Sequence, residues 1–111
     1  MPATVDADAI TKMYKEGKIK DMIVDGPMAL DIAVSAHAAE HKGYKGEIQG
    51  DADALLMPNI EAGNVMWKTL VYLAQAKIAG IVVGAAAPVV LTSRSDSPET
   101  KLNSIMLSLL M

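Results

Sequence analysis

Four short runs of apolar residues constrain the fold of this chain more than any other feature. The runs cover residues 22–24, 54–57, 81–83 and 89–91, and each is bounded on at least one side by Gly, Pro or Asp. Runs this short, with both faces apolar, are typical of strands buried in a parallel sheet. They alternate with segments of helical periodicity. We therefore expect an α/β protein in three layers, with a mostly parallel sheet flanked by helices.

The helical segments have recognisable ends. Asp6 or Asp8 can cap a first helix that ends before Gly17. A second helix is predicted from Met28 to His41, a third from Glu61 to Lys77, and a last one from Asp96, Ser97 or Pro98 to the end of the chain. In the last helix we expect the apolar side chains to face inward, namely Leu102, Ile105, Met106 and Leu109. Residues 43–53 are predicted to form a surface loop.

Length and composition bound the class of protein. The 111 residues fit one domain over 1–111, although four strands would make a small sheet for this class. The chain has no Phe and one Trp, so its core must consist of aliphatic residues and Met. It also has no Cys, which argues against disulfides, thiolate chemistry and Cys-based zinc sites.

The charge pattern disfavours two kinds of partner. A net charge of −3 with scattered Lys residues is unlike a nucleic-acid-binding surface. The longest apolar stretch, residues 78–92, is interrupted by Gly and Pro and is shorter than the roughly 20 residues that span a bilayer. With no signal peptide at the N-terminus, we expect a cytoplasmic protein that binds neither nucleic acid nor membrane.

The segment 92–99 is the most informative for chemistry. Arg94 is the one arginine among ten basic residues and precedes a helix N-terminus, where an anion is favoured. A guanidinium can give phosphate two parallel hydrogen bonds. The alternative is that a residue at 95–97 merely caps the helix while Arg94 faces water.

Two other junctions follow apolar runs. In the segment 58–64, Asn59 and Asn64 can donate to a ligand oxygen, and Gly63 allows close approach to the backbone. The alternative there is an Asx turn and a capped helix. Asp25-Gly26-Pro27 is a turn signal of the same kind.

Together these segments resemble one family. Residues 24–27, 50–53, 57–64, 79–84 and 91–94 match, in order and spacing, the phosphate butyryltransferase and phosphate acetyltransferase family. The resemblance covers nearly the whole chain. It implies part of the isocitrate dehydrogenase-like fold of these enzymes, and the reaction acyl-CoA plus phosphate giving acyl phosphate plus CoA. It implies no metal and no bound cofactor, because coenzyme A is a substrate.

The resemblance also suggests residue roles. Ser93 and Arg94 would be catalytic, with Arg94 holding phosphate and Ser93 stabilising the reacting carbonyl or thiol. Substrate-binding positions would be Asp25, Gly26, Asn59, Gly63 and Asn64.

Two departures from the acetyl branch are informative. Its carboxylate seven residues beyond the serine falls at Thr100 here, which leaves Glu99 and Asp96 as candidate bases. An arginine of that branch falls at Tyr72. Residues 90–94 favour a butyryl-type substrate.

Family members are much longer than this chain. We expect it to correspond to their C-terminal third, with the N-terminal domain absent, and to be an incomplete catalytic unit with negligible activity alone. The partners would then be acyl-CoA, inorganic phosphate and further copies of the chain.

Two other functions remain open from the sequence. One is a truncated, non-catalytic module that self-associates through exposed apolar surface. The other is a zinc metallopeptidase, since His37, Glu40 and His41 match the H-x-x-E-H pattern. A five-residue pattern arises easily by chance, so we expect no metal there.

Overall fold

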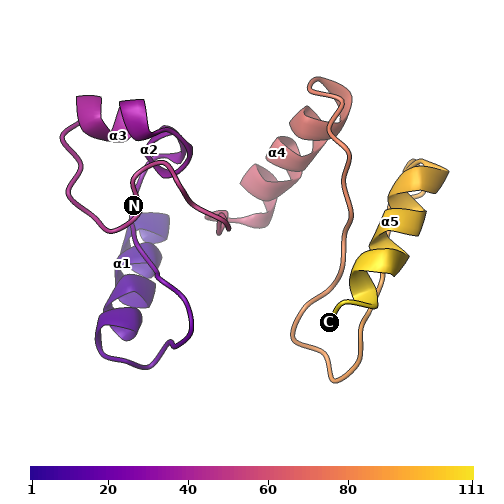
Figure 1. Cartoon of the computed structure of the whole chain (residues 1–111), viewed down its shortest axis with the longest axis horizontal. Helices are drawn as coiled ribbons and strands as arrows, with labels where there is room; N and C mark the ends of the chain where they lie inside the picture. Colours follow the sequence, from indigo (N-terminus) through magenta and orange to yellow (C-terminus); the bar gives the residue numbers. More distant parts are fainter. The chain divides into compact units, whose positions relative to one another are not determined.

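The computed structural model describes residues 1–111 and contains five helices. They are α1 (Pro2–Lys15), α2 (Leu30–Val34), α3 (Ala36–His41), α4 (Ile60–Tyr72) and α5 (Pro98–Ser108) (Figure 1). The chain forms two compact units, Met1–Gly63 and Asn64–Met111, and the single domain expected from its length stays a prediction.

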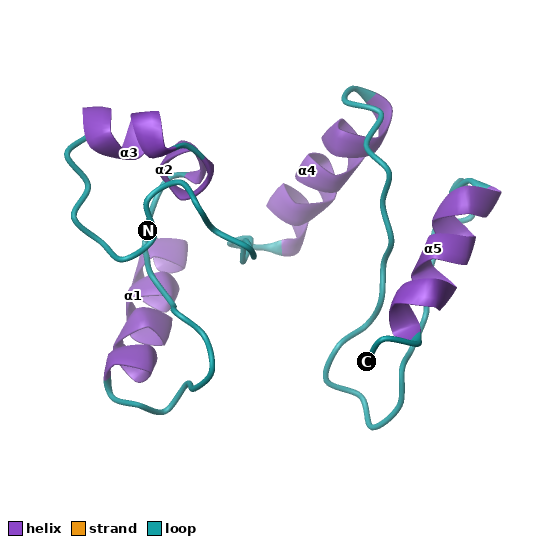
Figure 2. Ribbon diagram, viewed as in Figure 1, coloured by secondary structure: helices purple, strands orange, loops and turns teal.

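The expected parallel sheet is wrong. The structure has no strand, and Figure 2 shows only helices joined by loops. The single trace of β-structure is one antiparallel bridge between Val82 and Val89, in which the Val82 N–H donates to the Val89 carbonyl at 2.8 Å. The physical reason is that a strand requires a hydrogen-bonding neighbour along its length. Apolar composition cannot reveal whether that neighbour exists, and the other runs are extended or bent without one.

The helix ends differ from the expected ones where local geometry intervenes. The first helix begins at Pro2, ahead of Asp6, because proline suits the first helical position. The predicted helix 28–41 is broken at Ser35, which has extended dihedral angles of −141° and 109°. The Ser35 hydroxyl accepts from the Ala38 N–H at 3.3 Å and so caps α3.

The helix predicted from Glu61 to Lys77 is α4. It ends at Tyr72, five residues before the predicted end at Lys77. Gln75 follows in the left-handed region with φ of 52°, which stops the helical path. The last helix starts as predicted: Pro98 is its first residue, and the Ser97 hydroxyl accepts from the Thr100 N–H at 3.1 Å.

The first unit is held together by side-chain hydrogen bonds across its loops. Thr11, 4 % exposed on α1, donates to the Gly26 carbonyl at 3.0 Å. The buried apolar residues are few and lie on α2 and α3: Ile32, Ala33 and Ala39. Side-chain hydrogen bonds therefore stabilise this unit together with a small apolar core.

In the second unit, Ser104 joins α5 to the chain before it. Ser104 is fully buried, and its hydroxyl accepts from the Gly80 N–H at 3.0 Å and donates to the Thr100 carbonyl at 2.7 Å. Gly80 also lies against the Trp67 ring, at 3.7 Å from the position a Cβ would take. Gly80 therefore contacts both α5, through Ser104, and α4, through Trp67.

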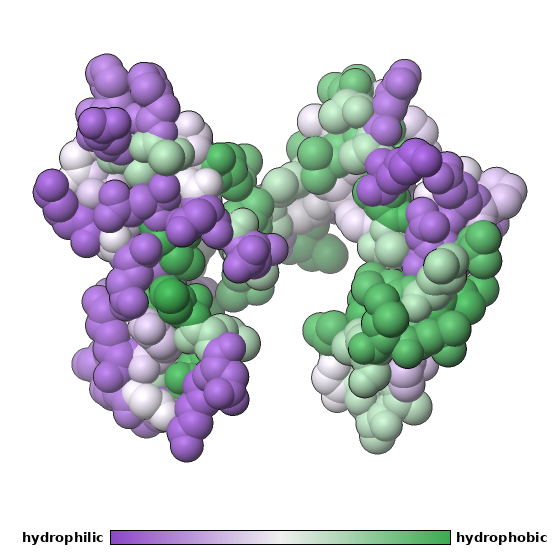
Figure 3. Space-filling model, in the orientation of Figure 1, coloured by the Kyte–Doolittle hydropathy of each residue, from purple (hydrophilic) through white to green (hydrophobic).

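The expectation that α5 buries its apolar face is wrong. The four apolar side chains that were expected to face inward are each more than half exposed, namely Leu102, Ile105, Met106 and Leu109. Figure 3 shows apolar residues gathered over the C-terminal part of the second unit. The side chain that faces inward is that of Ser104 instead.

No helix combines the length and the apolar character needed to cross a membrane.

Candidate functional site

Ser93 and Arg94 lie in a β-turn just before α5. The Asp96 N–H donates to the Ser93 carbonyl at 3.1 Å, which closes the turn with Arg94 and Ser95 in its centre. The Asp96 carboxylate in turn accepts from the Ser93 N–H at 2.7 Å. The backbone on both sides of Arg94 is therefore fixed, while the Arg94 side chain is exposed.

Arg94 carries a positive charge that no carboxylate neutralises. The three ion pairs of the chain join Lys18 to Glu16, Lys42 to Asp31 and Lys77 to Glu99. A guanidinium that is exposed and unpaired on a fixed turn can bind an external anion.

The Ser93 hydroxyl belongs to a chain of three hydroxyl groups. Its Oγ lies 3.1 Å from the Ser95 Oγ and accepts from the Ser95 N–H at 3.4 Å. The Tyr72 hydroxyl, at the end of α4, donates to the Ser95 Oγ at 3.3 Å. Sequence reasoning noted Tyr72 only as a departure and did not place Ser95 in the site.

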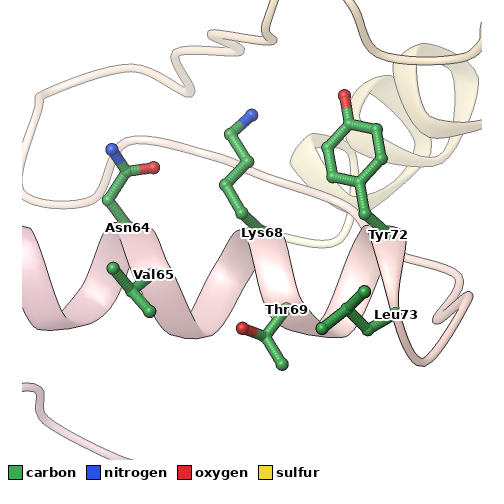
Figure 4. A pocket seen from close by; sticks show the side chains of 6 residues that line it. All are labelled: Asn64, Val65, Lys68, Thr69, Tyr72 and Leu73. Carbon is green, nitrogen blue, oxygen red and sulfur yellow. The ribbon is translucent and has the colours of Figure 1, made fainter.

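Tyr72 also ends a polar stripe on α4. Figure 4 shows Asn64, Lys68 and Tyr72 in one row along the helix, and Val65, Thr69 and Leu73 in the row beside it. These six side chains line a shallow pocket of about 320 Å³. The Lys68 Nζ lies 5.8 Å from the centre of the Tyr72 ring, within the range of a cation–π interaction. The spacing of four residues is the signal that could have found this stripe.

A second pocket, of about 330 Å³, lies between the end of α4 and the start of α5. Tyr72, Ser95 and Asp96 line it, as do Lys77 and Glu99. The Lys77 Nζ is 2.8 Å from the Glu99 carboxylate, and this hydrogen bond raises the pKa of Lys77.

Both candidate bases are occupied by protein partners. Glu99 pairs with Lys77, and Asp96 accepts the Ser93 N–H. At the position of the acetyl-branch carboxylate, the Thr100 hydroxyl lies 3.1 Å from the Ser97 hydroxyl. The structure thus presents Asp96 as a group that shapes the turn.

The remaining predicted substrate positions serve local structure. The Asn59 side chain accepts from the Ala62 N–H at 2.8 Å and caps α4, as the Asx alternative described. Gly63 lies against Met57, 3.6 Å from the position a Cβ would take. Asn64, the next residue, belongs to the stripe on α4.

Asp25 is the centre of a hydrogen-bond cluster in the first unit. Its carboxylate accepts from the Gly26 N–H at 2.9 Å, the Tyr44 hydroxyl at 3.0 Å and the Ile48 N–H at 3.1 Å. These bonds fasten the loop of residues 43–53 to the turn at Gly26. Burial, followed by the interaction with Asp25, raises the pKa of Tyr44.

His37 and His41 share a face of α3, with ring centres 5.5 Å apart. No group of three or more His, Cys, Asp or Glu side chains gathers to hold a metal ion, there or elsewhere in the chain. The H-x-x-E-H pattern brings two histidines together on one helix face, whereas a zinc peptidase uses three protein ligands.

An exposed, unpaired arginine on a fixed turn, with a serine hydroxyl before it, is an arrangement that can bind an anion. The chain belongs to the phosphate acetyl/butaryl transferase family, whose model matches residues 1–109. This family consists of acyltransferases, as the names of the relatives state.

Individual relatives agree with this assignment. The chain is 61 % identical over 110 residues to phosphate butyryltransferase of Clostridium acetobutylicum, covering 99 % of this chain and 36 % of that protein. It is 53 % identical over 108 residues to phosphate acetyltransferase of Thermotoga maritima, covering 97 % and 37 %. A crystal structure of a branched-chain phosphotransacylase from Enterococcus faecalis V583 superimposes with a TM-score of 0.87 at 43 % identity.

The match covers only part of each relative. The chain spans about a third of the length of the curated relatives and 40 % of the solved chain. Correspondence to the C-terminal third of the family stays a prediction from the sequence, because these shares give extent and no position.

Proposed function

We propose that this chain carries the Ser93–Arg94 part of a phosphate acyltransferase site. The reaction is acyl-CoA plus phosphate giving acyl phosphate plus CoA, with coenzyme A as a substrate and no metal or bound cofactor. The observation that carries the proposal is Arg94, exposed and unpaired at the centre of a turn that Asp96 holds closed.

The chemistry needs little beyond positioning and charge. A phosphate oxygen attacks the thioester carbonyl carbon, the tetrahedral intermediate collapses with cleavage of the carbon–sulfur bond, and the CoA thiolate leaves and takes up a proton. Arg94 would hold the attacking phosphate, and the Ser93 hydroxyl would donate to the carbonyl oxygen as negative charge develops on it. Neither Glu99 nor Asp96 is needed as a base in this scheme, because phosphate and thiolate are already charged.

Substrate contacts from other segments extend the proposal. Asn64 offers an amide on the α4 face that Tyr72 also occupies. The predicted roles of Asp25, Gly26, Asn59 and Gly63 would be exerted through the loops and helix end that they shape, since the Asp25 and Asn59 side chains are engaged in protein hydrogen bonds.

The proposal includes a preference for butyryl over acetyl groups and a cytoplasmic location. The higher identity to a phosphate butyryltransferase than to a phosphate acetyltransferase, 61 % against 53 %, supports the preference. Because most of the length of the relatives lies outside this chain, we propose that the isolated chain has negligible turnover.

Phosphate binding tests the site without requiring turnover. Titration of the 111-residue chain with inorganic phosphate, followed by ³¹P NMR, should show saturable binding. Arg94→Ala should weaken it at least about tenfold, the equivalent of one charge-assisted hydrogen bond. Lys101→Ala is the control, because it removes an exposed positive charge from α5 in the same unit. Equal weakening by both substitutions would reduce the effect to net charge and contradict the proposal.

Activity is tested in a chimera in which this chain replaces the matching 110 residues of the Clostridium acetobutylicum enzyme. Release of CoA from butyryl-CoA should exceed release from acetyl-CoA, and Arg94→Ala should remove both. A chimera that folds but transfers no acyl group, or a preference for acetyl-CoA, would overturn the corresponding part of the proposal.

A second candidate function is that of a non-catalytic, self-associating module. The exposed apolar side chains near the C-terminus favour it: Ile105, Leu109 and Leu110 are each more than half exposed. The occupant we propose for this surface is a second copy of the chain, and the two functions are compatible in one homo-oligomer.

A further inference from the structure

Tyr72 is the one side chain of the second unit that connects α4 to the Ser93 turn through a hydrogen bond. It is the last residue of α4, and its hydroxyl donates to the Ser95 Oγ at 3.3 Å. The residue is 59 % exposed, so burial alone does not explain the orientation of its side chain. Tyr72 has no role in the proposed reaction.

The Tyr72 hydrogen bond favours one direction in this chain of hydroxyl groups. Either hydroxyl of the Ser93–Ser95 pair, 3.1 Å apart, can be the donor, but the Ser95 Oγ accepts from Tyr72, and a hydroxyl that accepts a hydrogen bond becomes a stronger donor. With Ser95 as the donor, the Ser93 Oγ accepts two hydrogen bonds, from the Ser95 hydroxyl and from the Ser95 N–H. With both lone pairs engaged, Ser93 keeps its own proton for an external acceptor.

Two neighbouring groups reinforce this order. The Lys68 ammonium, 5.8 Å from the centre of the Tyr72 ring, withdraws electron density from the phenol and makes its hydroxyl a stronger donor. The Asp96 carboxylate holds the Ser93 N–H at 2.7 Å, so the backbone of Ser93 is fixed and only its side-chain rotation remains to be set.

We propose that Tyr72 is a positioning residue that acts through Ser95 to hold the Ser93 hydroxyl as a hydrogen-bond donor. The position of the hydroxyl is a property of the chain itself. Its use, as the donor to a thioester carbonyl oxygen, rests on the proposed function.

The rotamers of Ser93 and Ser95 test the proposal directly. In the ¹⁵N,¹³C-labelled 111-residue chain, three-bond Hα–Hβ couplings should show one dominant side-chain rotamer at both serines. In Tyr72→Phe the share of the minor rotamers should rise about fivefold at Ser95, as expected for the loss of one neutral hydrogen bond, and in the same direction at Ser93. Ser95→Ala should produce the change at Ser93 even when Tyr72 is intact.

Two controls separate positioning from general structure. Ser95→Thr keeps the hydroxyl and should retain the native rotamer at Ser93, whereas Tyr14→Phe removes a phenol hydroxyl from α1 in the first unit and should change neither serine. Global stability, followed by Trp67 fluorescence in urea, should be nearly the same in Tyr72→Phe as in the unsubstituted chain.

Rotamer averaging at Ser93 in the unsubstituted chain, or couplings at Ser93 that Tyr72→Phe and Ser95→Ala leave unchanged, would overturn the proposal. The outcome is independent of the transferase reaction. A chain that orders Ser93 but fails to bind phosphate would contradict the proposed function alone.

Discussion

Among single residues, Tyr44 is the one whose surroundings have the clearest consequence for pH dependence. Its neutral hydroxyl donates a hydrogen bond to the Asp25 carboxylate at 3.0 Å, and the loss of the Tyr44 proton would place a second negative charge beside that carboxylate. Burial is the larger cause of the raised pKa of Tyr44, and Asp25 adds to it. The folded chain therefore favours neutral Tyr44 more strongly than the unfolded chain does.

The sign of the effect follows from linkage. A group whose pKa is higher in the folded state contributes stability that is fully present below its unfolded pKa, near 10.0, and is lost as the pH rises through the folded value. We predict that the first unit loses stability in this alkaline range. In Tyr44→Phe that pH-dependent part should disappear. Ultraviolet absorbance at alkaline pH should show a tyrosine that ionises above the usual range, and Tyr44→Phe should remove that step; an unchanged titration would contradict the assignment.

Residue types and their local patterns allowed some side-chain contacts to be predicted. The Asn59 cap and the Ser97 cap each join residues three positions apart, so both partners of each hydrogen bond lie within one short segment of the sequence. The Tyr72–Ser95 bond joins residues 23 positions apart, and the Asp25–Ile48 bond also joins residues 23 apart. No local pattern can predict such pairs.

Among the elements, the break between α2 and α3 lies against a glycine outside both helices. Gly50 has φ of 96°, and a Cβ there would overlap the backbone of Ser35 and Ala36. Gly17 also has a left-handed φ, of 74°, but nothing lies within 4 Å of its Cβ position. Both glycines therefore have a left-handed backbone, but only at Gly50 is the position of a Cβ blocked by other atoms.

This pair gives a matched experiment on stability. Gly17→Ala should lower the free energy of unfolding by about 1 kcal/mol, the cost of a left-handed conformation for alanine. Gly50→Ala should cost at least about 2 kcal/mol more, because the backbone must move to relieve the overlap. Urea unfolding followed by far-ultraviolet circular dichroism measures both, and equal losses would show that the contact with Ser35 and Ala36 is absent in solution.

The start of α5 offers a second prediction about an element. Ser97→Ala removes the hydroxyl that accepts from the Thr100 N–H and should destabilise the second unit by about 1 kcal/mol. Ser108→Ala, which removes a hydroxyl from the last turn of the same helix, is the control and should change stability less. Trp67 fluorescence reports on this unit, because it contains the one tryptophan of the chain. A larger loss in Ser108→Ala would contradict the capping role.

At the scale of the whole molecule, the helices could be predicted but the layers could not. Helix formation depends on residues three and four apart, and all four predicted helical regions contain helices. A sheet depends on which distant segments pair, and here only Val82 and Val89 do so. The same limit explains α5, because a periodic apolar face predicts a covered surface without showing whether anything covers it.

That uncovered surface leads to a prediction about assembly. Leu109 is 80 % exposed and Ile105 is 52 % exposed, so a second copy of the chain could bury both. Each such side chain contributes roughly 2 kcal/mol when it leaves water. We predict that light scattering finds the chain as a dimer or larger assembly, and that the double substitution Ile105→Ser and Leu109→Ser raises the dissociation constant at least about tenfold. Val5→Ser, an equally apolar change at a 65 % exposed position on α1, is the control and should leave the assembly intact. A monomer at all concentrations, or dissociation caused equally by Val5→Ser, would show that this surface does not bind a second copy.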